Sequence, residues 1–191
     1  MKLSSLTALL LGGLALLSIS SCSGPQRKAE GPLTGDTIDV LTAQSTKALF
    51  DDIRAQDSSD EIWVAYVGVE NKSGVPQGGV LDEINVVVEE EFQNVKYSDG
   101  ATLFHRISNR LVEAGMREAG IRSPGDLVLR SKREAFIKVI TAEGHTPDYM
   151  MFGTITSIGT DGGARRYRLS LEIMRYDGEV IGQRSAKFTV N

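Results

Sequence analysis

The sequence has very little cysteine, tryptophan and histidine. Its 191 residues include one Cys, one Trp and two His, and aromatic residues make up 6% of the chain. A single Cys cannot form an intramolecular disulfide or supply the thiolates of a structural zinc site. The fold must therefore be held by an apolar core. About 130 residues beyond the N-terminal segments are enough for one domain with such a core.

No catalytic or metal-binding constellation is visible in the sequence. His105 and His145 have no neighbour at metal-ligand spacing, and we expect both on the surface or in turns. Residues 159–163 are rich in Gly but lack the Lys and the following helix of a phosphate-binding loop. The acidic residues 89–91 indicate a solvated helix face, because successive helical residues point in different directions. We expect no enzyme activity, no cofactor, no bound metal and no small-molecule substrate.

Charge of one sign is not in large excess. The chain has 21 basic and 25 acidic residues, a net charge of −4, and loss of an N-terminal segment that contains Lys2 would make this −5. Such a chain lacks the basic footprint of a nucleic-acid-binding protein. Local basic spots remain at Arg165, Arg166 and Arg168. Arg165 and Arg166 have two readings, contact with an acidic partner or protection of a strand edge, and we favour the second.

The N-terminus has the features of a secretory signal. Lys2 gives a charged start, residues 6–17 are almost wholly apolar, and small residues follow up to Cys22. This stretch is too short for a spanning helix and is typical of a removable signal. The sequence Ile-Ser-Ser-Cys at 19–22 resembles the lipobox of bacterial lipoproteins, in which the Cys thiol is diacylated and the signal is cut before it. The alternative is an ordinary signal peptide with a Cys nearby.

The lipobox implies a membrane-anchored protein. Residues 1–21 would be the signal, and the mature chain would begin at Cys22 and be held by its acyl chains. Ser23 stands where Asp retains lipoproteins of enteric bacteria in the inner membrane, so we expect the outer membrane, facing the periplasm. Residues 22–35 are polar and rich in Gly and Pro. They predict a flexible tether, which extends to about 45 Å at roughly 3.4 Å per residue.

Hydrophobic periodicity predicts an N-terminal helix at 36–56 and a globular domain at 61–191. Residues 62–69 are continuously apolar and predict a strand covered on both faces. Inward-facing residues are expected to be Ile107, Leu111, Ala114 and Met116 in one helix and Ala135, Phe136, Val139 and Ile140 in another. The predicted helices are 81–92, 107–119 and 131–143, ending at Gly120 and Gly144, and the other strands are 101–104, 149–158, 165–177 and 179–190.

This order of elements predicts one α/β domain. It has a mixed sheet, helices packed on the sheet, and an antiparallel meander of three C-terminal strands. The turns of the meander fall at 160–163 and at Asp177-Gly178. The turn at 71–74 (Asn-Lys-Ser-Gly) has two readings, a structural turn or an exposed partner-binding loop, and we favour the first.

Several segments together resemble the LpoB-like family of outer-membrane lipoproteins that activate penicillin-binding proteins. The resemblance covers about 62–190 and rests on VGVENKSG (67–74), LRSK (129–132), PDYMMFGTI (147–155), LSLEI (169–173) and DGEVIG (177–182). Related α/β domains occur in the N-terminal domain of TolB and in the curli secretion lipoprotein CsgG. No family residue that contacts a partner can be matched here position by position, so the partner surface remains open.

The resemblance implies a non-catalytic regulator of cell-wall synthesis. Such a lipoprotein docks on a bifunctional penicillin-binding protein and stimulates glycan polymerisation and cross-linking. The alternative is a CsgG-like secretion or envelope-assembly lipoprotein, which requires an oligomer and pore-lining strands. Residues 83–91 and 159–168 do not alternate over the roughly ten residues that a barrel strand needs. The tether of this chain is shorter than that of the enteric activators, which limits its reach.

Overall fold

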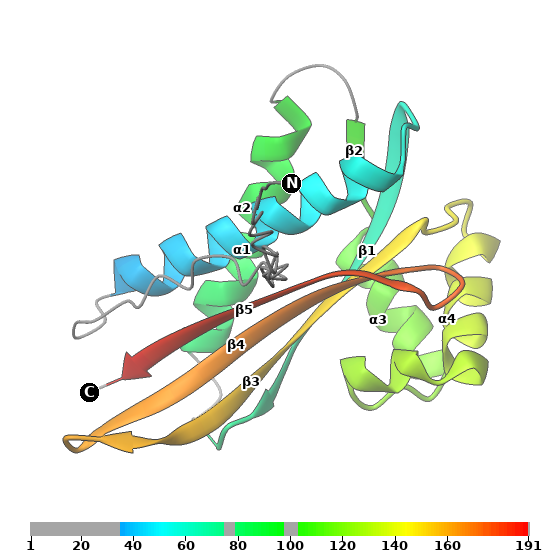
Figure 1. Cartoon of the computed structure of the whole chain (residues 1–191). Helices are drawn as coiled ribbons and strands as arrows, with labels where there is room; N and C mark the ends of the chain where they lie inside the picture. Colours follow the sequence, from blue (N-terminus) through cyan, green and yellow to red (C-terminus); the bar gives the residue numbers. More distant parts are fainter. Residues whose placement is uncertain (1–34, 75–78, 98–102, 191) are drawn as a thin grey trace, which may run out of the picture.

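Five strands form one mixed sheet in the order β2-β1-β3-β4-β5 (Figure 1). The strands are β1 (Glu61–Lys72), β2 (Leu103–Arg106), β3 (Tyr149–Asp161), β4 (Ala164–Arg175) and β5 (Val180–Val190). The protein is seen as a computed structural model that describes residues 35–74, 79–97 and 103–190. β2, β1 and β3 are parallel, whereas β3, β4 and β5 form an antiparallel meander. The predicted α/β fold with its C-terminal meander is confirmed.

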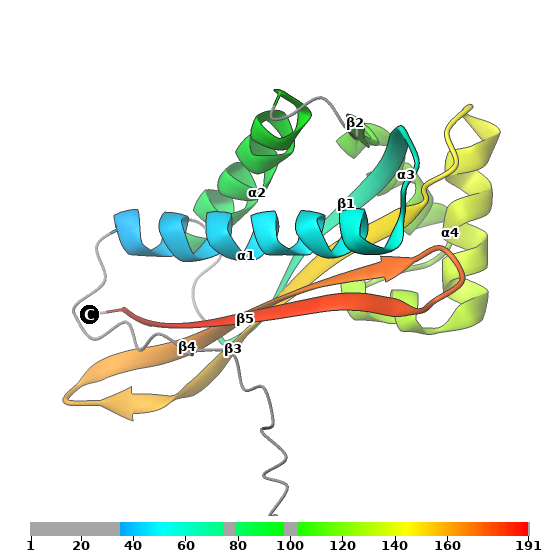
Figure 2. The same cartoon turned by 45° about the horizontal axis from the view of Figure 1, so that its top comes forward.

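Helices cover both faces of this sheet. α1 (Gly35–Gln56) and α2 (Val80–Tyr97) lie on one face, and α3 (Asn109–Glu118) and α4 (Arg130–Ala142) lie on the other (Figures 1 and 2). A short 3-10 helix, η1 (Pro124–Val128), precedes α4 and was not predicted. In the described part of the chain no helix is long and apolar enough to cross a membrane. The predicted signal, Cys22 and nearly all of the predicted tether lie outside the described residues.

β1 is the strand that carries both cores. Ile62 and Val64 point to the core under α1 and α2, and Ala65 and Val67 point to the core under α3 and α4. The two sets alternate along the strand because successive side chains point to opposite faces. The continuous apolar run at 62–69 therefore serves two layers, as predicted.

The N-terminal helix packs on the domain rather than standing free. Leu49, Phe50 and Ile53 of α1 are fully buried in the first core. The ring of Phe50 lies 4.8 Å from that of Phe92 on α2, edge to face, and 4.8 Å from that of Phe104 on β2. Such aromatic contacts add to the stabilisation that burial of the rings provides. α1 is thus a structural part of the same core as the sheet.

The helix after β2 begins later than predicted and presents a different face. α3 starts at Asn109, and Ile107 is buried in the loop before it, where its N–H donates to the Val64 carbonyl at 3.0 Å. Val112 and Gly115 occupy the centre of the buried face. Leu111, Met116 and Ala114 are only partly buried. A Cβ at Gly115 would lie 2.9 Å from the Phe136 ring, so Gly lets α3 approach α4 closely.

The other elements differ from prediction mainly at their ends. α2 extends to Tyr97, and its Val run at 86–88 is helical, with Val86 exposed and the next two residues buried. β2 lies at 103–106, two residues later than predicted, and Ala101 lies outside the described residues. In α4, Phe136 and Ile140 are fully buried as expected, whereas Ala135 and Val139 are only partly buried. Gly120 and Gly144 follow the ends of α3 and α4, as predicted.

We predict that Phe50→Ala lowers the free energy of unfolding by about 3–5 kcal/mol, because it empties a fully buried site between α1, α2 and β2. Urea unfolding followed by circular dichroism measures this loss. The matched control is Val40→Ala on the same helix, where the side chain is 52% exposed and the change should stay within about 0.5 kcal/mol. Equal effects of the two substitutions would show that α1 does not belong to the core.

Candidate partner-binding surface

The β4–β5 turn is held by a network around one arginine and one aspartate. The carboxylate of Asp177 accepts from Arg175 Nη2 at 2.6 Å and from the Glu179 N–H at 3.1 Å. These hydrogen bonds, the one from Arg175 foremost, lower the pKa of Asp177. Gly178 has a φ of +102°, a left-handed conformation that favours glycine. The predicted Asp-Gly turn is therefore present, and the hydrogen bonds to the Asp177 carboxylate hold it in place.

A buried arginine ties this turn to α4. Arg133, in the first turns of α4, has only 6% of its surface exposed. It donates to the carbonyls of Tyr176 (3.2 Å) and Asp177 (2.9 Å) in the turn, and to those of Leu127 (3.0 Å) and Val128 (3.3 Å) at the end of η1. Its partners are four carbonyl oxygens, and no ion pair to it is found among residues 35–74, 79–97 and 103–190. A planar guanidinium suits this role because its donors point in several fixed directions.

The turn approaches the arginine so closely that a side chain would not fit between them. A Cβ placed at Gly178 would lie 2.6 Å from Arg133 Cζ. The start of β3 supports the same turn, since the Asp148 carbonyl accepts from the Tyr176 N–H at 3.0 Å. The Asp148 carboxylate accepts from the Trp63 N–H at 2.8 Å, and burial raises the pKa of this carboxyl group. The turn is therefore a rigid platform rather than a loose loop.

Large apolar side chains are exposed around this platform. Four residues form what we call the end patch: Val128 (63% exposed), Leu129 (57%), Tyr176 (54%) and Val180 (50%). All four lie near the same turn: the carbonyls of Val128 and Tyr176 both accept from Arg133, Leu129 follows Val128, and Val180 pairs with Met174 at the start of β5. Two further large apolar side chains are comparably exposed in the described chain, Val40 and Val86. Clustered exposed apolar residues of this kind mark interaction sites more often than isolated ones do.

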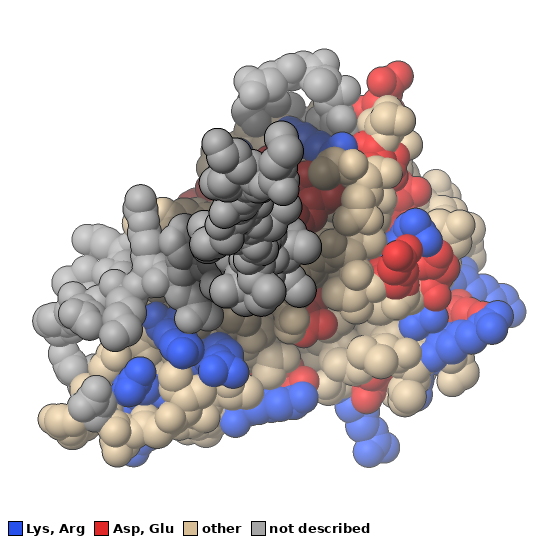
Figure 3. Space-filling view, in the orientation of Figure 1, with Lys and Arg blue, Asp and Glu red and all other residues tan. Residues whose placement is uncertain are grey.

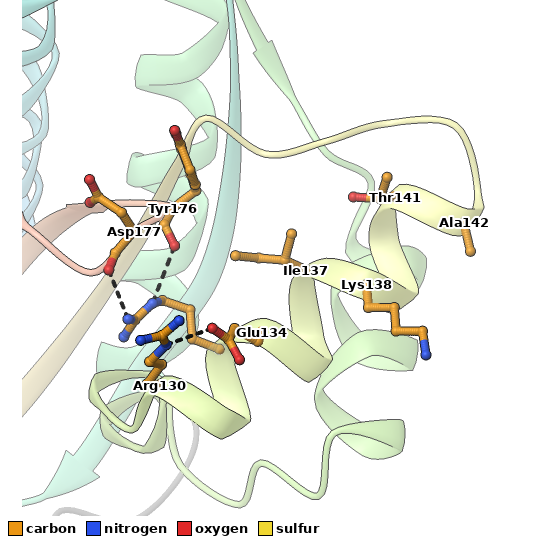
Figure 4. A pocket seen from close by; sticks show the side chains of 9 residues that line it. Arg130, Glu134, Ile137, Lys138, Thr141, Ala142, Tyr176 and Asp177 are labelled. Atoms are coloured by element: carbon orange, nitrogen blue, oxygen red, sulfur yellow. Dashed lines mark hydrogen bonds and ion pairs between the residues drawn. The ribbon is translucent and has the colours of Figure 1, made fainter.

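A groove of about 800 Å³ runs beside the end patch, between α4 and the β4–β5 turn (Figure 4). Ile137 points from α4 toward the turn, and charged side chains stand at the rim, with Arg130 Nε bound to Glu134 at 2.7 Å. The lining residues are Arg130, Arg133, Glu134, Ile137, Lys138, Thr141, Ala142, Tyr176 and Asp177. An apolar strip with charges of both signs at its rim resembles a protein interface in composition.

The two histidines, which showed no ligand spacing in the sequence, come together on the single tryptophan. The ring of His105 lies 4.5 Å from that of Trp63, and the ring of His145 lies 4.2 Å away, each stacked. His145 is in the loop before β3, whereas His105 lies within β2 and is partly buried rather than in a turn. In the described residues no group of three His, Cys, Asp or Glu side chains could hold a metal ion.

The remaining candidate residues are separated from the end patch. Glu89 pairs with Arg106 at 2.7 Å rather than pointing freely into solvent, while Glu90 is exposed. In the turn at 71–74, the side chain of Asn71 accepts from the Ser73 N–H at 3.0 Å, which is the structural role expected of it. Arg165, Arg166 and Arg168 lie on β4 near its start, at the opposite end of that strand from the β4–β5 turn.

Sequence reasoning did not single out Arg133 or the end patch. One signal was available, because Arg133 precedes Phe136 and Ile140 by three and seven residues and so falls on their apolar helix face. Its partners in the turn are 43 and 44 residues away along the chain. Their meeting depends on the packing of α4 against the sheet and could not be predicted from spacing.

The architecture is similar to that of several solved structures. The chain matches no protein-family model and no curated protein sequence. Among solved structures, it is similar to the C-terminal domain of LpoB from Salmonella enterica, with 14% identity and a TM-score of 0.50 over 78% of this chain and 96% of that one. The C-terminal domain of LpoB from Escherichia coli has a TM-score of 0.47, with 14% identity over 78% of this chain and 98% of that one.

A third similar structure is lipoprotein GNA1162 from Neisseria meningitidis. Its TM-score is 0.46, with 14% identity over 66% of this chain and 81% of that one. The similarity to the Salmonella enterica domain shows that this chain has the fold of the LpoB C-terminal domain, and the predicted resemblance is confirmed at the level of the fold. Identity this low establishes shared architecture and leaves function to be argued from the surface.

We predict that Arg133→Met lowers the free energy of unfolding by about 2 kcal/mol, because buried carbonyls at two elements lose their donor. Arg130→Met, three residues earlier with a side chain that is 82% exposed, should change it by less than about 0.5 kcal/mol. Urea unfolding measures both. Hydrogen exchange should show faster opening of the β4–β5 turn in the Arg133 variant only. Unchanged exchange there would contradict the role of Arg133 in holding the turn against α4.

Proposed function

We propose that the protein is a non-catalytic lipoprotein, anchored through Cys22 in the outer membrane, that binds and activates a peptidoglycan synthase. The observation that carries the proposal is the end patch on a domain with the fold of the LpoB C-terminal domain. The lipobox at 19–22 supports envelope localisation, and the absence of a catalytic constellation in the sequence supports a regulatory role. The partner expected from the LpoB resemblance is a bifunctional penicillin-binding protein.

The end patch supplies the docking surface in this proposal. Tyr176 combines a large apolar area with a hydroxyl, which is typical of residues that dominate binding energy at interfaces. The charged groups Arg130, Glu134 and Lys138 form the rim around Ile137 in the groove. Because Arg133 fixes the turn against α4, the patch is held in one arrangement before binding, which lowers the entropic cost of association.

Activation follows if the docked protein binds the active form of the synthase more tightly than the inactive form. The equilibrium then shifts toward the active form by the ratio of the two affinities. A tenfold shift needs a difference of about 1.4 kcal/mol, which is the size of one good apolar contact. No chemical step by this chain is required.

The short tether remains compatible with a partner in the periplasm. The last turn of α1 lies near the end patch, since Gln56 Nε2 donates to the Ile181 carbonyl at 3.2 Å. The 22 residues of α1 thus span about 33 Å from the tether toward the patch, at 1.5 Å per residue. Together with about 45 Å of extended tether, the patch can lie roughly 80 Å from the anchor.

We predict that the mature chain raises the glycan-polymerisation rate of a bifunctional penicillin-binding protein from the same organism. Tyr176→Ser combined with Val128→Ser should weaken this stimulation at least about thirtyfold in half-maximal concentration, since both remove apolar contacts of the end patch. The matched control is Val86→Ser on α2, at 52% exposure, which should behave as the unmodified chain.

The possible outcomes test the activator proposal and the proposed docking surface separately. No binding and no stimulation by the unmodified chain would exclude the activator proposal, and a ring-shaped oligomer in detergent would favour the envelope-assembly alternative. Stimulation that survives the double substitution would keep the activator proposal and move the docking surface elsewhere.

A further inference from the structure

At the end of the molecule opposite the end patch, the strands carry several basic residues. α1 runs antiparallel to β5, because Asp52 near its end pairs with Arg184 near the start of β5 at 2.7 Å. The first turn of α1, the β3–β4 turn and the last residues of β5 therefore lie at one end (Figures 1 and 2). Arg165, Arg166 and Arg168 of β4 and Lys187 of β5 lie at this end, and we call these four residues the basic end.

The basic residues are arranged at a cost in stability. Arg168 lies directly opposite Lys187 in the β4–β5 register, and like charges in such pairs repel. In the described part of the chain, Arg165, Arg168 and Lys187 have no ion pair with an acidic side chain. A sequence selected for stability alone would favour opposite charges at these positions, so the arrangement calls for an anionic ligand outside the chain.

Protection of a strand edge does not explain the arginines. β4 is an inner strand, paired with β3 on one side and β5 on the other, so its backbone presents no free edge. The edge-protection reading that the sequence favoured for Arg165 and Arg166 is therefore wrong. Only Lys187 lies on an edge strand, β5.

The basic end also lies beyond the cover of the helices on one sheet face. α3 and α4 pack over Met150, Phe152 and Met174, toward the other end of the strands. The face that carries Arg168 and Lys187 continues with small polar groups such as Ser170 and Ser185, whose hydroxyl oxygens lie 3.0 Å apart. Figure 3 shows basic side chains gathered at the lower left, over the ends of the strands. A cationic surface that extends over two strands suits an extended anionic surface better than a small ligand.

The anchor enters the domain at the same end. Only residues 23–34 separate Cys22 from the start of α1, at most about 45 Å of chain. Acyl chains together with basic residues are the usual two-part signal for stable membrane attachment. We propose that the basic end rests on anionic phospholipid headgroups of the membrane that holds the Cys22 acyl chains. This inference rests on the proposed lipidation of Cys22.

Headgroup contact would orient the domain. With the basic end on the lipid surface, the end patch at the far end of α1 points away from the membrane, toward the peptidoglycan. A tethered domain without this contact samples all orientations, and many of them turn the patch toward the lipid. The same contact would therefore anchor the domain and present its docking surface.

Vesicle binding tests the inference without the acyl chains. The mature chain from residue 22 with Cys22→Ser is mixed with phosphatidylcholine vesicles that contain or lack phosphatidylglycerol, and binding is followed by co-sedimentation. We expect binding only to the anionic vesicles and loss of binding at high salt. Arg165→Gln, Arg168→Gln and Lys187→Gln together should weaken it about a hundredfold, at about fivefold per basic residue.

A control variant with the same change in net charge tests whether the effect depends on where the basic residues lie. Arg110→Gln, Arg117→Gln and Arg122→Gln change three exposed arginines on and just after α3, and this variant should bind as the parent does. No binding of the parent to anionic vesicles, or equal loss in both triple variants, would overturn the inference. If the basic-end variant kept vesicle binding but lost synthase stimulation in detergent, the basic end would contact an acidic protein partner instead.

Discussion

The end of this molecule that carries the end patch depends on one buried guanidinium. Arg133 supplies donors to carbonyls at the end of η1 and in the β4–β5 turn, and so joins a helical layer to the tip of the sheet. Burying a charge on carbonyl oxygens alone is expensive, and the sequence accommodates it with Gly178, where any Cβ would collide with the guanidinium. The exposed Val128 and Tyr176 owe their adjacency to this contact. The buried side chain of Arg133 thereby determines the shape of the surface outside it.

The two ends of the sheet have opposite character. At one end, apolar side chains surround a rigid turn, and at the other, basic side chains crowd an uncovered sheet face. α1 runs between the two ends and packs into the core through Leu49, Phe50 and Ile53. The helix that follows the predicted tether is therefore rigidly coupled to both surfaces. A membrane contact at one end would fix the direction of the other.

The order of helices and strands could be predicted from local patterns, because periodicity and turn residues are local properties. The alternation from Tyr167 to Ile173 and the Asp177-Gly178 turn identify the meander, and the apolar run at 62–69 identifies the central strand. Strand order depends on contacts between distant segments, so the sequence could not predict that β4 is an inner strand. For the same reason it could not show that Arg165 and Arg166 do not protect a strand edge. The same holds for the end patch, since apolar Val128 and Leu129 next to a helix would ordinarily be assigned to a core. The stack of His105 and His145 on Trp63 joins three segments that are distant in sequence.

The central claim is that the end patch, and not the basic end, meets the synthase. Site-specific photo-cross-linking in intact cells, with a photoreactive residue at position 176, 86 or 165 in turn, tests it most directly. The account predicts a covalent adduct with a penicillin-binding protein from position 176 and none from positions 86 and 165. An adduct with the synthase from position 165, and none from position 176, would contradict it.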